Sequence, residues 1–139
     1  TNQNWTNYTA NDKNYGNINN WKFSTSLTNF HSLFMNNPRF NEDISSWDVS
    51  NVTTMYAMFM GTDFNKNISS WNIGNVSDLR YCFKGSAFNN GSITDDGKNP
   101  LTWTITTGNL QCDHTTFQDS SFKQDVSDAF RIKSTCWIT

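Results

Sequence analysis

The hydrophobic positions in the middle of the chain recur every 24 residues. Residues 40–63 read FNEDISSWDVSNVTTMYAMFMGTD, and residues 64–87 read FNKNISSWNIGNVSDLRYCFKGSA. The matching apolar pairs are Phe40 and Phe64, Trp47 and Trp71, Val52 and Val76, and Phe59 and Phe83. Self-similarity at a fixed period is the signature of a repeat architecture, in which each unit buries its apolar face against its neighbours.

Each unit carries two different spacings of its apolar residues. Trp47 and Val49 alternate with polar residues, as in a half-buried strand. Over residues 52–59 the spacing changes to three and four, which predicts a turn or two of helix. Gly61 and Gly85 follow, where a left-handed residue commonly ends a helix. We therefore expect one short strand and one short helical return in each unit.

Weaker copies of the unit flank the two clear ones. Residues 21–39 form one copy, Phe88 opens another, and a partial unit starts at Phe122. An insertion rich in Gly, Asp and Asn interrupts the copy after Phe88, at residues 91–100. The predicted fold is an α/β repeat solenoid, leucine-rich-repeat-like, with four to five coils; the alternative is an all-β right-handed solenoid.

The domain organisation follows from the same pattern. Residues 1–20 are a polar, Asn-rich N-terminal cap or extension, and residues 21–139 form a single solenoid with the loop near 91–100 inserted in it. Four tryptophans in one column indicate a buried ladder rather than a carbohydrate platform. The predicted core ladder comprises Trp21, Trp47, Trp71, Trp103, Phe34, Phe59, Phe83 and Phe117.

If the tryptophans point inward, alternation turns the next residues outward. This candidate binding face comprises Lys22, Ser24, Asp48, Ser50, Asn72, Thr104 and Thr106. A flat face of small hydroxyl, amide and charged groups is a common recognition surface on a repeat protein. The residue types leave open whether it meets a glycan, a protein or an identical molecule.

The phrase FNxxISSWxxxNVxxMxxMFxG at 40–61, repeated as FNKNISSWNIGNVSDLRYCFKG, resembles the repeat of the BspA-like surface proteins. That family is a divergent relative of leucine-rich repeats. Its members occur on the outer surface of bacteria and protists and in some phage and viral particles. The resemblance covers about residues 21–122, and is loose outside the two clear units. It implies a secreted or surface-displayed module for adhesion or recognition, without catalysis.

Three cysteines add a structural prediction. Cys112 and Cys136 are one repeat period apart, and both align with the position of Thr54, with a register uncertain by one residue. Equivalent Cα atoms of stacked coils lie about 4.8 Å apart, which a disulfide accepts. We therefore expect a Cys112–Cys136 bridge, worth about 3 kcal/mol. Cys82 occupies the slot of Met58 and is expected to be a buried apolar residue.

Composition and charge argue against several functions. The net charge of −2 gives no basic field for nucleic acid, and the scattered Lys and Arg residues form no membrane patch. Adjacent residues such as Cys112, Asp113 and His114 seldom face one another, so they indicate no catalytic dyad. The loop at 92–99 holds two carboxylates, but lacks the distal Glu of a calcium loop and is expected to be an ordinary turn. We expect no enzyme activity, no cofactor and no metal.

The sequence thus predicts an extracellular adhesion or receptor-recognition module on a cell or virion surface, acting on a protein or a glycan. The low share of charged residues, 16%, with uncharged Asn, Ser and Thr in their place, is common in proteins exposed outside cells. The alternative function is a building block of a fibre, phage or viral appendage, or particle decoration that associates with copies of itself. A chain that opens without Met favours a piece of something larger.

Overall fold

The computed structural model describes residues 8–10, 13–94, 98–106, 108 and 110–126. Its regular elements lie at the N-terminal end. The strands β1 (Tyr8–Ala10) and β2 (Lys13–Gly16) pair antiparallel, and the short 3-10 helix η1 spans Ile18–Asn20. The side chain of Asn17 accepts from the backbone N–H of Asn19 and so caps η1.

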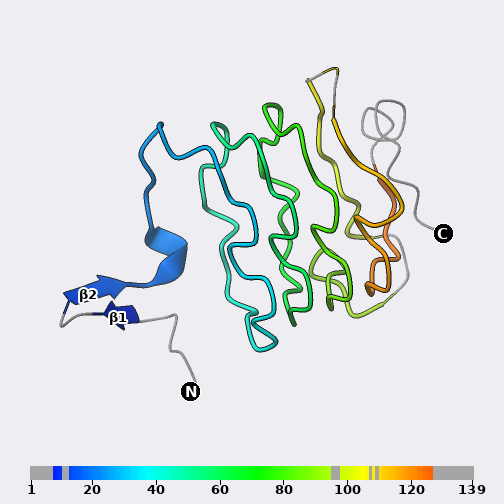
Figure 1. The fold of residues 1–139 in the computed structure, drawn as a ribbon. Helices are drawn as coiled ribbons and strands as arrows, with labels where there is room; N and C mark the ends of the chain where they lie inside the picture. Colours follow the sequence, from blue (N-terminus) through cyan, green and yellow to red (C-terminus); the bar gives the residue numbers. More distant parts are fainter. Residues whose placement is uncertain (1–7, 11–12, 95–97, 107, 109, 127–139) are drawn as a thin grey trace.

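Beyond η1, the chain winds into successive turns that lie side by side (Figure 1). We call these turns coil 1 (residues 17–39), coil 2 (40–63), coil 3 (64–87) and coil 4 (88–121). Parallel backbone bridges join equivalent positions of neighbouring coils: Asn29 with Thr54, Thr54 with Asp78, and Asp78 with Gln111. The 24-residue period of the sequence is therefore the length of one turn of the stack.

A regular backbone ladder runs along one side of coils 2 and 3. The N–H groups of residues 55, 57, 59 and 61 donate to the carbonyls of residues 78, 80, 82 and 84, at 2.8–3.0 Å. The N–H groups of residues 58, 60 and 62 instead donate three residues back within coil 2. In this segment the N–H groups of odd-numbered residues thus bond to the next coil, and those of even-numbered residues close turns within their own coil. We call residues 53–61 and their equivalents the ladder side.

Left-handed residues produce this alternation. In coil 2, Ala57 and Gly61 have φ of 53° and 69°; in coil 3, Tyr81 and Gly85 have φ of 60° and 63°. The left-handed conformation predicted for the two glycines is thus confirmed. The helical turn expected over residues 52–59 is not formed, because a left-handed residue in mid-segment redirects every second N–H to the next coil.

The tryptophans stand on the opposite side, which we call the Trp side (residues 44–52 and their equivalents). Each indole Nε1–H donates to a backbone carbonyl of the preceding coil: Trp47 to Ile18 at 2.7 Å, Trp71 to Ile44 at 3.2 Å, and Trp103 to Ile68 at 2.9 Å. Because a buried carbonyl without a donor is costly, these bonds fix the spacing of the coils on this side. The expected strand at 47–49 is absent here.

Two columns of phenylalanine rings fill the core between the two sides. Rings at equivalent positions lie nearly parallel, with centroids 5.4–6.1 Å apart along each column. The columns also touch one another, as at Phe59 and Phe64, whose centroids are 4.1 Å apart. One column comprises Phe34, Phe59, Phe83 and Phe117, and the other Phe40, Phe64, Phe88 and Phe122.

The predicted core residues are placed as follows. Trp47, Trp71, Trp103 and the phenylalanines at 34, 59, 83 and 117 are buried, whereas Trp21 is only half-buried at the end of the stack. Ile18 is 1% exposed and stands in the column of Ile44 and Ile68. Ile18 thus belongs to the same buried column as the isoleucines of coils 2 and 3.

Buried amides hold the insertion of coil 4 against coil 3. Asn90 is fully buried, accepts from the Ile68 N–H, and donates to Ser69 and to the carbonyls of Asn99 and Pro100. An asparagine ladder lies beside it, since Asn41 accepts from the N–H of Asn65, and Asn65 from that of Asn89. The insertion thus starts from a well-bonded corner.

Candidate functional site

The predicted binding face lies on the Trp side, and the structure describes all seven of its residues. Lys22, Asp48, Asn72 and the remaining positions except Ser50 are exposed, while Ser50 is half-buried. The residues following each tryptophan thus point outward. The face crosses all four coils.

Most polar groups of this face bond within their own or the neighbouring coil. The Asp48 carboxylate accepts from the N–H and the hydroxyl of Ser50, and Asn72 accepts from the Gly74 N–H. Thr106 donates to the Gly74 carbonyl at 2.6 Å. The hydrogen bonds from Ser50, together with the charge of Lys22, lower the pKa of Asp48. These groups mainly stabilise turns, which leaves fewer of them for a partner.

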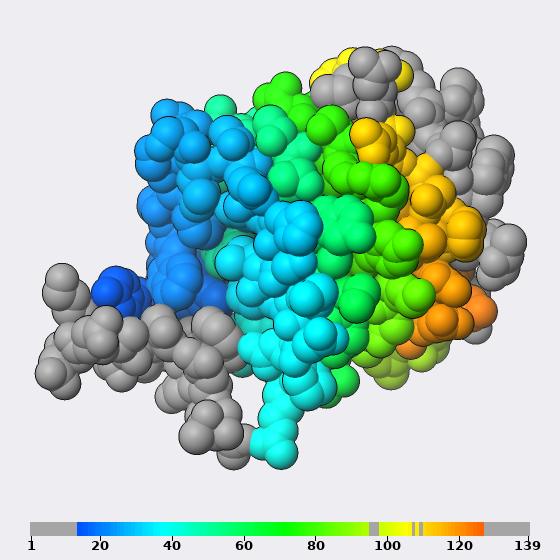
Figure 2. All heavy atoms as spheres, in the orientation of Figure 1, coloured from blue at the N-terminus to red at the C-terminus, as the bar shows by residue number. Residues whose placement is uncertain are grey.

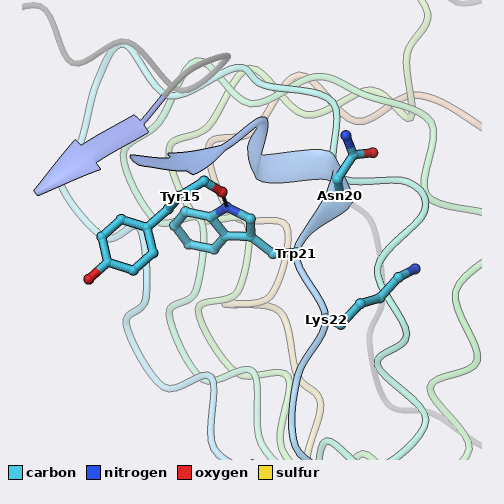
Figure 3. Close-up of a pocket in the computed structure, with 4 residues that line it drawn as sticks. All are labelled: Tyr15, Asn20, Trp21 and Lys22. Atoms are coloured by element: carbon cyan, nitrogen blue, oxygen red, sulfur yellow. Dashed lines mark hydrogen bonds between the residues drawn. The ribbon is translucent and has the colours of Figure 1, made fainter. Parts of the chain in front are cut away.

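A hollow lies at the coil 1 end of the Trp side. Tyr15, Asn20, Trp21 and Lys22 line it (Figure 3). The Trp21 indole donates to the carbonyl of Tyr15 at 2.9 Å, and the two rings meet edge to face with centroids 6.4 Å apart. Asn20 and Lys22 point away from the two rings (Figure 3). The hollow holds one charged group and has an apolar wall of two rings.

The ladder side carries a different set of outward side chains, which contact one another from coil to coil. His31 stacks on Tyr56 with centroids 4.8 Å apart and planes 11° apart, and the centroids of Tyr56 and Tyr81 are 5.4 Å apart. The Arg80 guanidinium lies 5.6 Å from the centre of the Tyr56 ring, and the Lys84 ammonium lies 5.5 Å from that of Tyr81. We call these five residues the ladder row.

Arg80 is the most strongly positioned member of the ladder row. Its Nε and Nη2 donate to the two carboxylate oxygens of Asp78 at 3.0 and 2.8 Å. This bidentate pair raises the pKa of Arg80, and the side chain is still 40% exposed. Asp113 continues the column in coil 4; burial pushes its pKa up, but hydrogen bonds from Thr115 outweigh this and lower it. The guanidinium is thus preorganised and open to a partner.

The ladder row was not predicted from the sequence. Its members fall in the segment assigned to a helical turn, where their outward direction does not follow from period-2 alternation. A usable signal was present, because polar or aromatic residues at positions 31, 56 and 80 recur at intervals of 25 and 24 residues, close to the repeat period; the insertion in coil 4 delays the next, at position 113. Only the backbone bridges show that these positions form one column.

The cysteine register predicted from the sequence is wrong by one residue. Thr54 pairs with Asp78, and Asp78 with Gln111, so Cys112 continues the inward column of Met55 and Leu79. Coil 4 has one residue more than coil 3 between this column and the phenylalanine column, which accounts for the shift. Cys136 lies outside the described residues, so the Cys112–Cys136 bridge stays a prediction. Cys82 is buried, and burial raises the pKa of its thiol.

The other candidate sites bring no catalytic pair and no group of metal ligands together in the described part of the chain. His114 is exposed, whereas Cys112 is buried with its sulfur 3.3 Å from the Thr116 hydroxyl. Asp95 and Asp96 of the calcium candidate lie outside the described residues. Among residues that are described, no three His, Cys, Asp or Glu side chains group together as metal ligands would, and no helix could cross a bilayer.

Similar units stacked in register, with equivalent residues bonded from coil to coil, define a repeat protein. The chain belongs to the family described as "Mycoplasma protein of unknown function, DUF285", whose model matches residues 2–128. No curated protein matches the chain. No solved structure matches it either.

Proposed function

We propose that this chain is a non-catalytic recognition module, displayed outside the cell, that binds a protein on another surface through the ladder row. The observation that carries the proposal is the row itself. His31, Tyr56, Arg80 and Tyr81 come from three different coils and touch one another while still reaching solvent. The proposed fold class is a leucine-rich-repeat-like solenoid of the BspA-like type.

The residue types of the ladder row suit a protein partner. Tyr and Arg are enriched among the few residues that carry most of the binding energy of protein interfaces. The Tyr56 ring is contacted by His31, by Tyr81 and by the Arg80 guanidinium, which leaves less of it free to stack on a sugar ring. Because Asp78 fixes the Arg80 guanidinium, binding would restrict few additional rotamers.

Display outside the cell is supported by composition and by the repeat phrase. Only 16% of residues are charged. The uncharged amide and hydroxyl groups bond backbone at many corners, as Thr62 and Ser86 do to the carbonyls of Phe59 and Phe83. The phrase FNxxISSW, which carries the resemblance to BspA-like surface proteins, forms the corner between the Phe column and the Trp side.

The test is binding of the fluorescently labelled chain to a panel of intact animal cell lines. We expect saturable binding that protease treatment of the cells removes and periodate oxidation of surface glycans spares. The double variant Tyr56→Ala/Arg80→Ala should bind at least about tenfold more weakly. Its unfolding midpoint should be compared with that of the wild type, so that a loss of binding is not a loss of folding. Binding unaffected by the double change, or no binding to any line, would contradict the proposal.

A further inference from the structure

The outer edge of coil 1 carries a row of backbone acceptors without donors. Four carbonyls accept no hydrogen bond within the described part of the chain: those of Asn29, His31, Leu33 and Met35. Their equivalents in coil 2, at residues 54–60, each accept an N–H of coil 1 at 2.8–3.0 Å. The edge therefore offers the same acceptors that bind one coil to the next inside the stack.

The same edge leaves side chains exposed that are core residues in the inner coils. Leu33 is 47% exposed, whereas Met58 and Cys82 in its column are 0% exposed. Leu27 is 41% exposed, whereas Val52 in its column is 2% exposed. Figure 2 shows coil 1, in blue to cyan, at one end of the row of coils. End coils of repeat proteins usually carry polar outer faces, and this one does not.

The opposite end of the stack is covered by the chain itself. Leu101 of coil 4 forms a parallel bridge with Val126. The Phe122 ring stacks on the Phe117 ring, with centroids 4.6 Å apart. The edge of coil 4 is thus not open to coil 1 of a second copy, and the missing donors have to come from a different partner.

The charge around coil 1 indicates the chemistry of that partner. Residues 13–39 contain Lys13, Lys22 and Arg39, but no Asp or Glu. Lys22 and Arg39 are exposed. A surface of one sign of charge attracts groups of the opposite sign and repels those of the same sign. The coil 1 edge therefore combines free acceptors, exposed apolar side chains and positive charge.

We propose that the coil 1 edge binds an acidic peptide segment of a partner protein. The segment donates backbone N–H groups to the free carbonyls, covers Leu27 and Leu33 with apolar side chains, and places its carboxylates near the cations of coil 1. Addition of a peptide to an open backbone edge is a general mode of recognition, in which main-chain hydrogen bonds give affinity and side chains give specificity.

The free carbonyls favour a peptide over an anionic membrane. Lipid chains offer no hydrogen-bond donor, and a carbonyl buried in hydrocarbon without a donor is costly. A peptide supplies a donor for such a carbonyl from its own backbone. This edge is also a different surface from the exposed side chains of the ladder row, so the two binding events can be tested separately.

The first test selects binders to the full chain from a library of random peptides displayed on phage. Enriched peptides should carry Asp or Glu beside apolar residues. They should bind Leu33→Lys at least about tenfold more weakly, because the change puts a charge where an apolar contact is expected. Ile93→Lys is the matched control and should bind like wild type, because Ile93 is 97% exposed on the inserted loop. Unfolding midpoints of both variants show whether they remain folded.

The outcomes separate this proposal from the proposed function. Tyr56→Ala/Arg80→Ala should bind the enriched peptides like wild type, since the ladder row is not part of this edge. The proposal is overturned if the library gives no enriched peptide, if enriched peptides lack acidic residues, or if they bind Leu33→Lys as tightly as wild type.

A second measurement tests the backbone hydrogen bonds. An enriched peptide is synthesised in two forms, each N-methylated at one of the two sets of alternate positions. Only one set of N–H groups faces the coil 1 edge, so one form should lose at least about tenfold in affinity and the other should lose clearly less. Equal affinities of the two forms would refute the backbone contact.

Two further measurements test other occupants of the edge. The chain should not bind vesicles that contain phosphatidylserine, and its mass in sedimentation velocity should not grow as concentration rises. Vesicle binding that Leu33→Lys abolishes would place a membrane on this edge. Growth in mass that the same variant abolishes would place a second copy there. Either result would overturn the proposal.

Discussion

The Trp side and the ladder side of each coil are built from the same repeat, but they hold the stack together in different ways. On the Trp side, an indole N–H reaches back to a carbonyl of the preceding coil, and the outward polar groups close local turns. On the ladder side, backbone N–H groups reach forward to the next coil, and the outward side chains touch across coils. Where the backbone holds the coils together, side chains are free for another role.

The substitution with the largest expected effect on stability disrupts the core between the two sides. Phe59 packs against Phe64, Phe83 and Trp71, so it joins the two sides in the core. Phe59→Ala should lower the free energy of unfolding by about 3–5 kcal/mol, because the rigid ring columns close poorly over a cavity. Urea unfolding measures this loss. Phe59→Leu keeps most of the volume and should lose clearly less; an equal loss in both variants would mean that ring stacking, not volume, dominates.

A smaller effect isolates the Trp side. Trp47→Phe removes the donor to the buried Ile18 carbonyl and should cost about 1–3 kcal/mol. Trp21→Phe removes the corresponding bond to Tyr15 at an exposed site, where water can replace it, so it should cost less. Thermal unfolding of the two variants gives the comparison. If both variants lose the same stability, the buried indole hydrogen bond of Trp47 is not what holds the coils together on the Trp side.

The next effect isolates the ladder side. A Cβ at Gly85 would meet nothing within 4 Å, but its φ is 63°. Gly85→Ala should therefore destabilise by about 1 kcal/mol through the left-handed backbone alone. Gly108→Ala is the matched control, since it also meets nothing and has no left-handed φ; it should leave the unfolding midpoint nearly unchanged. Gly85→Asn should lose less than Gly85→Ala, because Asn36 adopts φ of 57° at the same position of coil 1.

The smallest expected effect is on the stability of the protein at acidic pH. The pKa of Asp48 is lowered in the folded protein from its ordinary 3.8, first by the hydrogen bond from the Ser50 side chain. A lowered pKa adds stability above the unfolded value, and this is lost as the pH falls through the folded value. Asp48→Asn should keep the turn at neutral pH, as Asn72 does in the next coil. Unfolding midpoints measured from pH 7 down to pH 3 should fall less steeply in the variant; an identical fall would remove Asp48 from the account.

The sequence predicted the repeat and most of the core. On the Trp side, apolar and polar residues alternate along the chain, and the apolar ones are buried while the polar ones are exposed. Trp47 and Val49 are buried with Asp48 exposed between them, and Trp103 and Ile105 flank exposed Thr104 in the same way. The expectation of a repeat protein is confirmed by the family match. The buried tryptophans of coils 2 to 4 therefore followed from spacing, whereas Ile18, which extends the isoleucine column into coil 1, did not.

The backbone ladder and the ladder row could not be predicted in the same way. The ladder bonds join main-chain atoms, so apolar spacing does not locate them. Residues 52–59 have helical spacing, but left-handed Ala57 reverses the chain within them, and Ala gives no signal for that conformation. The cysteine register failed for a related reason, since the extra residue in coil 4 follows Cys112. Only the paired backbone revealed the column of His31, Tyr56 and Arg80.

The most direct test of the proposed role is a comparison of the two faces in one binding experiment. Tyr56→Ala/Arg80→Ala changes the ladder row, and Lys22→Ala/Asn72→Ala removes exposed groups of the Trp side. Both variants and the wild type are titrated onto the cell line that binds wild type best. The account predicts that the ladder variant loses at least about tenfold in affinity, while the Trp-side variant binds like wild type. Loss of binding in the Trp-side variant alone would contradict it and return the recognition surface to the face predicted from the sequence.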